Sequence, residues 1–192
     1  IVGTAPVHTV GGKVNEPVYA SNYAEAVAAM GYSDEWDKYD ICEEIYSSFK
    51  LYSNGPIIMV NVLDPAKHLK GAETVEKTLA GGITELPYEA VSDTVEVKGY
   101  DGEDSLTETY TRGEDYDLFY TDGVLRLERI ESGKIKADNA RLNIKFNSVD
   151  PSKVTKKEII GGYDTNTNKS SGFELVDSVY PKYLSLIHIS EP

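Results

Sequence analysis

The sequence predicts a mixed α+β or α/β protein in which an all-β domain, of barrel or sandwich-like type, is inserted into an α/β domain. Three observations support this prediction. Residues 14–63 alternate apolar strands with amphipathic helices, residues 71–150 carry short strand-like segments between turn formers, and helical signals return after Pro151. We therefore expect a discontinuous α/β domain over residues 1–70 and 151–183, with the β domain over residues 71–150.

Composition limits the classes of partner. The chain has 192 residues, of which 40% are hydrophobic, enough to bury the core of one or two domains. Acidic residues outnumber basic ones by 32 to 19, and the net charge of −13 repels nucleic-acid phosphates and anionic lipid headgroups. We expect neither nucleic acid nor membrane as a partner. The single cysteine, Cys42, excludes an internal disulfide and a thiolate-rich metal cage.

Two helices are expected in the first α/β segment. Asn22 and Glu25 have capping-box spacing, and Gly31 stands where a left-handed C-terminal residue is needed. Asp40 and Glu43 form a second start signal. The apolar residues that follow recur at four, four and three positions and form one stripe that should face a core: Ile41, Ile45, Phe49 and Tyr52.

Strands are expected around these helices. A short extended piece covers Pro17 to Tyr19, and Ile1 to Gly3 has the composition of a strand, so we expect the chain to begin inside a sheet. The run from Ile57 to Leu63 is almost entirely apolar, rich in β-branched residues and too short for a typical helix. It predicts a buried central strand covered on both faces.

The expected β domain consists of short strands at close spacing. Asp122 and Gly123 predict a tight hairpin turn, and the loop from Asp101 to Thr111 is polar enough to be solvated. Leu142, Ile144 and Phe146 alternate with polar residues and should face inward. The predicted strands are Thr94 to Val97, Asp117 to Tyr120, Val124 to Ile130, Ile135 to Ala137 and Arg141 to Phe146.

Two further helices are expected beyond Pro151. Thr155 can cap a short helix over residues 156–160 that ends at Gly161, and a second helix over residues 172–180 should stop at Pro181.

No catalytic, cofactor-binding or metal-binding residue is predicted, and we do not expect an enzyme. Cys42 lies on an apolar helix face, which favours a buried structural thiol. Gly11-Gly12-Lys13 and Ser132-Gly133-Lys134 lack the spacing of phosphate-binding loops and should be ordinary turns. Six acids could in principle chelate calcium, but their spacing does not match a calcium loop and favours a solvated face: Asp101, Glu103, Asp104, Glu114, Asp115 and Asp117.

Both ends of the sequence have unusual features. It opens on Ile1 without an initiator Met, and residues 184–192 resemble the translation of a sequencing adapter, so we expect a non-native tail there. The natural sequence would then stop near Tyr183, and the chain would be an N-terminal fragment of a longer protein.

Several segments, taken in order, resemble the tail sheath family of contractile-tailed phages and prophage-derived tail-like particles. They are IVGTAPVH at Ile1, AEAVAAMGYSDEWDKYDICEEIYSSF in residues 24–49, IIMVNVLDPAKH at Ile57, DPSKVTKKEIIGG at Asp150 and GFELVDSVYPKY at Gly172. The resemblance covers most of residues 1–183 and is weakest in the acidic β segment.

The resemblance implies a structural subunit of the virion tail, assembled in the cytoplasm of a bacterial host. In such proteins an α/β domain lies near the inner tube, an inserted β domain projects outward, and terminal arms add strands to neighbouring sheets. The implied partners are other sheath subunits, the tail tube and the baseplate, with no cofactor. The alternative is a carbohydrate- or surface-binding β module, for which the fourteen tyrosines are suited.

If parts of the α/β domain are missing, its sheet edge and the stripe from Ile41 to Tyr52 would lack partners. We then expect this chain, expressed alone, to aggregate or to be partly molten rather than to form filaments.

Overall fold

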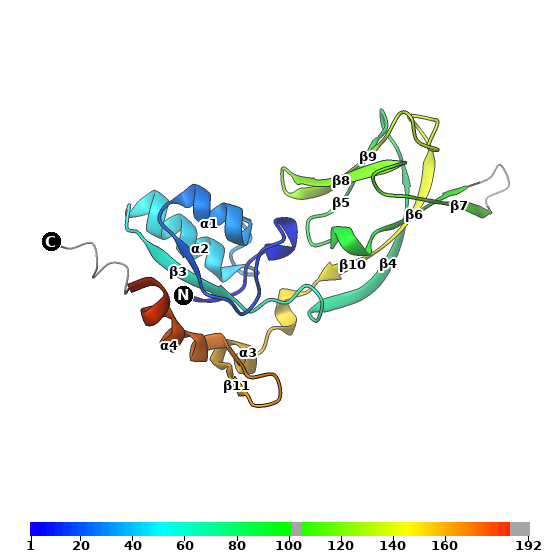
Figure 1. Cartoon of the computed structure of the whole chain (residues 1–192). Coiled ribbons are helices and arrows are strands. Elements are labelled where there is room, and N and C mark those ends of the chain that lie inside the picture. The colour runs from blue at the N-terminus through cyan, green and yellow to red at the C-terminus, as the bar shows by residue number, and fades with distance from the viewer. Residues whose placement is uncertain (101–104, 185–192) are drawn as a thin grey trace. The chain divides into compact units, whose positions relative to one another are not determined.

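The computed structural model describes residues 1–100 and 105–184 (Figure 1). They form two compact units, and each is described here by itself. Unit 1 consists of residues 1–68 together with the chain from Pro151 onward, and unit 2 consists of residues 69–150.

Unit 1 is built on a three-stranded sheet with the order β1-β3-β2. β3 (Ile57–Asn61) lies in the centre, parallel to β1 (Val2–Gly3) and antiparallel to β2 (Val18–Ala20). The predicted central strand is confirmed, although it ends at Asn61 rather than Leu63. Its last three residues are buried, whereas Ile57 and Ile58 are partly exposed.

The polar residue Asn61 explains where β3 ends. Its side chain is fully buried, and its Oδ1 accepts hydrogen bonds from the backbone N–H groups of Ala5 (3.0 Å) and Leu63 (3.1 Å). Its Nδ2 donates to the carbonyl oxygen of Leu63 (2.8 Å). The amide thus satisfies backbone groups that the sheet leaves unpaired.

The first predicted helix is α1 (Tyr23–Met30). The Asn22 side chain accepts from the Glu25 N–H at 3.0 Å, and Gly31 has a φ of 73°, as expected. The reciprocal half of the capping box differs. The Glu25 carboxylate accepts from the N–H and the hydroxyl of Ser21, both at 2.8 Å, one residue before the expected partner.

The second helix, α2 (Asp40–Tyr46), continues as the π-helical turn η2 (Ser47–Leu51). The helix start predicted at Asp40 is confirmed in position, but the N-cap residue is Tyr39 and no side chain caps the helix. Asp40 accepts instead from the N–H (2.5 Å) and hydroxyl (2.9 Å) of Thr4. A Cβ on Gly3 would clash with the Asp40 carboxylate and would force it to move, so glycine at this position leaves room for the contact with Thr4. A tertiary contact therefore replaces the local cap.

The helices and the sheet of unit 1 share an apolar core. Ile41 and Ile45 are fully buried in it, Phe49 packs against its margin, and Tyr52 is 76% exposed. The expectation that this whole stripe lacks cover is therefore wrong for its first half. The buried residues of the core come from five elements and the loop before η1 (Val7–Thr9): Ala5, Val7, Ala20, Ala26, Met30, Ile41, Ile45 and Met59.

The rest of unit 1 is a chain of short elements. The predicted cap of α3 (Lys156–Ile160) at Thr155 is confirmed, and Glu158 completes a capping box that was not predicted. The hairpin of β11 (Gly162–Asp164) and β12 (Lys169–Ser171) was not predicted. The remaining elements are the turns η1 (Val7–Thr9), η4 (Pro151–Lys153) and η5 (Gly172–Leu175), the helix α4 (Val176–Val179) and the π-helical turn η6 (Tyr180–Leu184).

Pro181 does not stop the last helix, contrary to the prediction. The backbone continues in helical turns to Leu184 as η6. Proline removes one backbone donor, and in this segment the hydrogen-bonding pattern changes from α to π type instead of ending.

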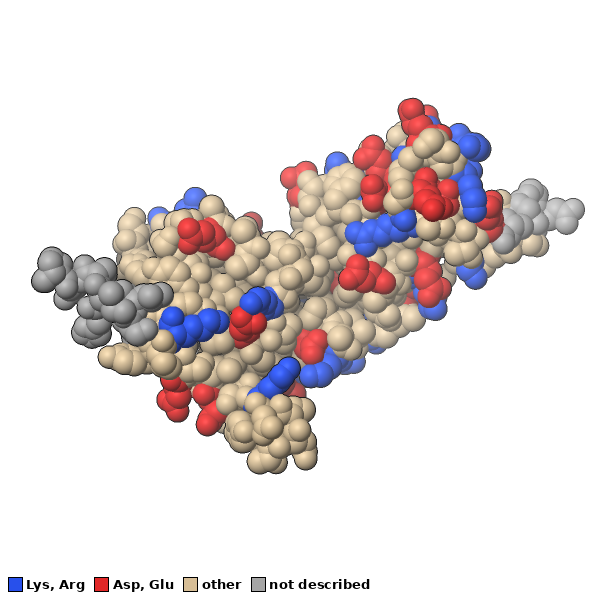
Figure 2. Space-filling view, viewed as in Figure 1, with Lys and Arg blue, Asp and Glu red and all other residues tan. Residues whose placement is uncertain are grey.

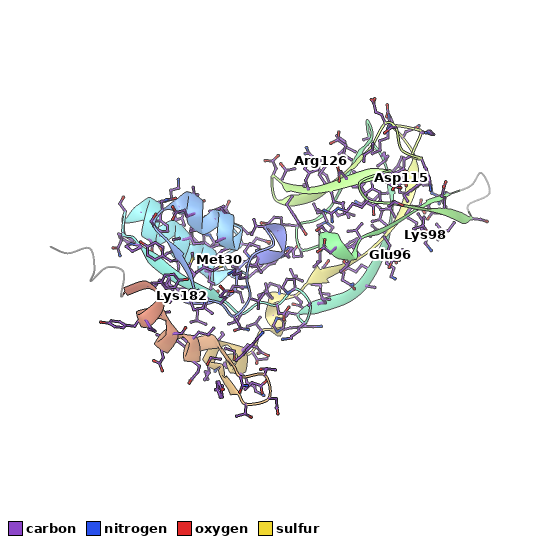
Figure 3. All side chains as sticks on the ribbon, in the orientation of Figure 1. Met30, Glu96, Lys98, Asp115, Arg126 and Lys182 are labelled. Carbon is purple, nitrogen blue, oxygen red and sulfur yellow. The ribbon has the colours of Figure 1, made fainter. Side chains whose placement is uncertain are left out.

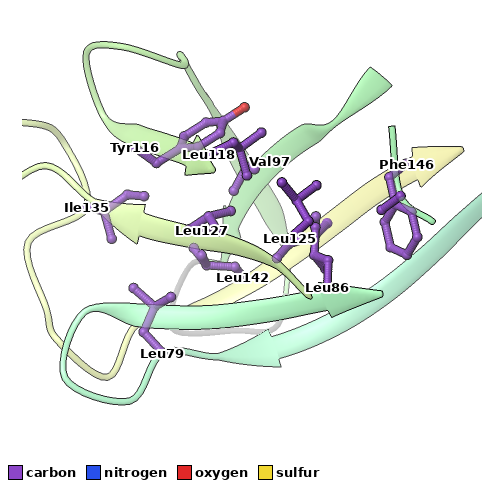
Figure 4. Packing of buried hydrophobic residues seen from close by; sticks show 12 residues of the cluster. Leu79, Leu86, Val97, Tyr116, Leu118, Leu125, Leu127, Ile135, Leu142 and Phe146 are labelled. Carbon is purple, nitrogen blue, oxygen red and sulfur yellow. The ribbon is translucent and has the colours of Figure 1, made fainter. Parts of the chain in front are cut away.

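Unit 2 consists of two antiparallel sheets. The larger has the order β4-β10-β6-β7 and the smaller β5-β9-β8. Neither closes into a barrel, so the barrel alternative is wrong, and the sheets face each other across one core (Figure 4). The strands are β4 (Leu69–Thr78), β5 (Ile83–Pro87), β6 (Glu96–Tyr100), β7 (Leu106–Tyr110), β8 (Tyr116–Thr121), β9 (Val124–Arg129) and β10 (Arg141–Val149), with the turn η3 (Ser92–Thr94) before β6.

Several predictions for this unit are confirmed. Asp122 (φ 49°) and Gly123 (φ 77°) form the tight turn between β8 and β9, where both residues need a positive φ. Leu142, Ile144 and Phe146 of β10 are buried in the core, together with Leu79, Leu86, Ala90, Val97, Tyr116, Leu118, Leu125, Leu127 and Ile135.

Other predictions for unit 2 are wrong. Residues 135–137 form a loop, although Ile135 is buried in the core. The expected solvated loop of residues 101–111 contains strand β7, and its residues 101–104 lie outside the described ones. β4 and β5 were missed. β4 gives no signal because most of its side chains are exposed on both faces.

Candidate assembly surfaces

The acidic residues of unit 2 do not converge on a metal site. Among residues 1–100 and 105–184, no three histidine, cysteine or acidic side chains are grouped to hold an ion. Buried Asp115 (Figure 3) accepts hydrogen bonds from the N–H groups of Thr111 and Lys134, both at 2.8 Å, and these bonds lower its pKa. Glu114 and Asp117 are exposed, and Asp101, Glu103 and Asp104 fall outside the described residues. Asp115 therefore organises a turn.

The other reactive side chains also have structural surroundings. Cys42 is fully buried, and burial raises the pKa of its thiol to about 11, so the nucleophilic thiolate is not populated at neutral pH. His68 Nδ1 accepts from the N–H of Asp64 at 2.9 Å in a loop. The described residues therefore offer no arrangement of nucleophile and base at these positions.

The two glycine-lysine turns also have structural roles. A Cβ on Gly12 would lie 2.3 Å from the carbonyl oxygen of Ala29, and one on Gly133 would lie 2.6 Å from the Cα of Asp115. Lys13 forms an ion pair with Glu16. Glycine is needed for close packing at both turns, so neither requires a phosphate ligand to explain it.

No helix among the residues that the structure describes is long and apolar enough to cross a lipid bilayer.

The edge of the unit 1 sheet that is formed by β2 lies beside a groove. β2 is an outer strand, and a hollow of about 520 Å³ lies against it, which we call the β2 groove. The groove is lined by residues 10–13 and 16–19, by Ala28 and Ala29 of α1, and by Lys182 and Tyr183 of η6. A free strand edge beside a groove can accept an added strand from another chain.

Contacts from η6 hold the chain beside this groove. The ring of Tyr183 stacks on that of Tyr19, with 5.8 Å between centroids, and its hydroxyl donates to the carbonyl oxygen of Pro17 at 2.6 Å. Lys182 Nζ lies 3.6 Å from a carboxylate oxygen of Glu16 (Figure 3). These contacts fix η6 against the residues that line the β2 groove on the β2 side.

A second surface of unit 1 is apolar and exposed. Phe173, Val176 and Tyr180 recur at helical spacing along η5, α4 and η6, and their exposed fractions are 53%, 49% and 59%. We call these three residues the C-terminal stripe. Ile160 (65%) and Tyr163 (56%) are also exposed on preceding elements. Exposed apolar side chains grouped in this way indicate an interaction surface.

Four of the five tyrosines of unit 2 do not form such a surface, and the fifth, Tyr100, lies under Arg141. Tyr116 and Tyr120 are packed in or against the core, and the Tyr120 hydroxyl donates to the carbonyl oxygen of Ala90 at 2.6 Å. Tyr88 contacts Tyr120 edge to face, and Tyr110 packs against the core. These rings serve packing rather than a binding platform, which weakens the case for a carbohydrate-binding module.

Charges on the outer faces of unit 2 are paired across strands. Arg141 binds the Glu76 carboxylate and lies over the ring of Tyr100, 4.2 Å from its centroid. Lys145 lies 3.4 Å from Glu96. Figure 2 shows basic and acidic side chains intermixed on the visible face of this unit. The visible face thus has no continuous positive stripe for a polyanion.

The comparison with curated proteins shows what this chain is similar to. The chain is 29% identical over 185 residues to the "Tail sheath protein" of Burkholderia phage BcepMu, a match that covers 95% of this chain and 35% of that protein. The chain is a homologue of a phage tail sheath protein. It spans about a third of the length of that relative. No protein-family model and no solved structure matches the chain.

The family resemblance inferred from the sequence motifs is thereby confirmed. The similarity to a tail sheath protein supports a structural role in a phage tail sheath. Sequence reasoning did not anticipate the β2 groove or the C-terminal stripe. Phe173, Val176 and Tyr180 do have a helical period, but that period alone cannot distinguish a buried face from an exposed one.

Proposed function

We propose that this chain is part of a contractile tail sheath subunit that polymerises helically around an inner tail tube. Contraction of the sheath would drive the tube through a bacterial envelope. The similarity to a tail sheath protein over 95% of the chain carries this proposal. The subunit would belong to the virion tail and be assembled in the cytoplasm of the bacterial host.

The surfaces of unit 1 support an assembly role. A strand of a neighbouring subunit could pair with the free edge of β2, and the C-terminal stripe would be covered in an assembly. Repeated contacts between different patches generate open helical arrays rather than closed rings. In this proposal unit 1 corresponds to the α/β domain near the tube, and unit 2 to the inserted domain that projects outward.

The proposed partners are other sheath subunits, the tail tube and the baseplate. Contraction would release free energy because subunits pack better in the contracted lattice than in the extended one. The mechanism then needs no cofactor.

The test uses an antibody raised against this chain. Contractile particles from a bacterium that encodes the sequence are labelled with immunogold and imaged by negative-stain microscopy in extended and contracted form. We expect label along the whole sheath in both forms, with a shorter labelled length after contraction. Pre-immune serum is the control. Label on the tail tip alone would favour a surface-binding module, and absence of label from tails would contradict the proposal.

A further inference from the structure

Strand β4 provides the longest free edge in the described part of the chain. It has ten residues and lies at the margin of its sheet, where β10 is its only partner strand among the described residues (Figure 1). The other outer strands of unit 2 are shorter, and β5 contains Pro87, which cannot donate to an added strand. A long free edge is a template for pairing with another chain.

The exposure of β4 is consistent with an added strand. Residues 70–74 are exposed, and Val75 is partly buried against the core. Val75 pairs with Ile144 of β10, so Glu73, Val75 and Lys77 lie on the same face of the sheet as the core residues. Two charged residues of opposite sign therefore flank Val75 at equal distances along one face.

This arrangement selects one antiparallel self-pairing. If β4 pairs with β4 of a second copy about a two-fold axis at Val75, Glu73 of each strand faces Lys77 of the other. The other antiparallel registers that pair seven or more residues of LKGAETVEKT either place like charges directly opposite each other or bring no opposite charges together. Opposite charges across strands stabilise pairing, and like charges oppose it.

We propose that β4 is a self-association edge, which pairs antiparallel with β4 of a second copy of this chain, centred on Val75. The pairing joins two four-stranded sheets edge to edge over residues 72–78. Such a contact uses the same patch twice and closes as a dimer, whereas sheath polymerisation needs contacts between different patches. The inference therefore does not depend on the proposed function, and either can fail alone.

Charge reversal tests the register. We expect sedimentation velocity to show a monomer–dimer equilibrium for the 192-residue chain. Glu73→Lys or Lys77→Glu should weaken dimerisation about tenfold or more, because each places two pairs of like charges opposite each other. The double variant Glu73→Lys/Lys77→Glu should restore it. Glu131→Lys, on an exposed turn outside β4, is the control for charge alone.

A cysteine pair tests the centre of symmetry. Directly paired antiparallel residues have Cα atoms about 4.5–5.5 Å apart, a separation that a disulfide can span. Val75→Cys should therefore form a covalent dimer under mild oxidation, and Ala72→Cys should do so more slowly. Cys42 is buried, so the unsubstituted chain controls for its contribution.

Three results would overturn the proposal. One is a chain that stays monomeric, with no preferential crosslinking at Val75→Cys. Another is a dimer that charge reversal at Glu73 does not affect, which would point to the C-terminal stripe instead. The third is a double variant that fails to recover dimerisation, since it would exclude this register. Circular dichroism of each variant verifies that the fold is retained.

Discussion

The two units differ in how completely each buries its own apolar residues. Among the described residues, ten of the twelve large hydrophobic side chains that are exposed belong to unit 1, and only Leu106 and Phe119 belong to unit 2. Unit 2 consists of two sheets that cover each other's inner faces, so its core is complete. Unit 1 has a three-stranded sheet in which β2 pairs only with β3 among the described residues, and a helical segment with exposed apolar side chains.

The difference in exposed apolar side chains indicates which unit makes the assembly contacts. In a domain with a complete core, surface residues can be substituted with little loss of stability. Exposed apolar side chains, in contrast, favour association, because covering them with another chain lowers the free energy. In a relative of a tail sheath protein, the exposed apolar side chains of unit 1 are therefore the better candidates for permanent contacts. The charged edge of β4 is suited to a weaker contact.

The largest expected effect is in the closed core of unit 2. Leu127 is fully buried between the sheets, so Leu127→Ala should lower the free energy of unfolding of unit 2 by about 2–5 kcal/mol. Hydrogen exchange of the β9 amides in increasing urea measures the loss. Leu106→Ala, at a side chain that is 48% exposed, is the matched control and should have a much smaller effect. If the two variants lose the same free energy of unfolding, Leu127 is not buried in a packed core between the sheets.

A smaller effect is expected at Asp115. Asp115→Asn removes a charged acceptor from one of two backbone N–H groups and should lower the stability of unit 2 at neutral pH by about 1 kcal/mol. The pKa of Asp115 is lowered in the folded state, so its carboxylate stabilises the fold above its ordinary pKa and this contribution is lost as pH falls through the lowered value.

The two proteins should therefore approach the same stability in acid. Urea unfolding at neutral pH and at several values below about pH 4 measures the difference. If the free energies of unfolding of wild type and Asp115→Asn differ by the same amount at every pH, the charge of the carboxylate does not contribute to stability.

Substitutions in the C-terminal stripe of unit 1 should have the smallest effect on stability. They should have a clear effect on aggregation and dye binding. Phe173→Ser together with Tyr180→Ser should change the free energy of unfolding by no more than about 0.5 kcal/mol, because both side chains are exposed. The same change should reduce aggregation and the binding of an apolar dye. Phe119→Ser in unit 2 is the control. If dye binding and aggregation are unchanged, the C-terminal stripe is not the apolar surface through which unit 1 associates.

Local signals in the sequence predicted many elements correctly. The cap at Asn22, the turn at Asp122 and Gly123, the cap at Thr155 and the inward face of β10 follow from short-range rules, and the structure confirms them. Sequence motifs also indicated a resemblance to the tail sheath family, which the similarity to a curated tail sheath protein confirms.

Other features could not be predicted because distant residues decide them. Asp40 has the spacing of a helix cap, yet it binds Thr4, which lies 36 positions earlier in the chain. Ile135 is buried without being in a strand. β4 is held by its hydrogen bonds to β10 and not by apolar alternation, so its own residues give no strand signal.

The sequence by itself determined the turn at Asp122 and Gly123 and the helix caps at Asn22 and Thr155, because these depend on residues close together in the chain. The tertiary structure decided which apolar faces are closed and which remain open. Ile41 and Phe173 both lie on helical apolar faces, but one is buried against its own sheet and the other is exposed. Burial is a property of the whole fold, since it depends on which distant segments return to cover a given face.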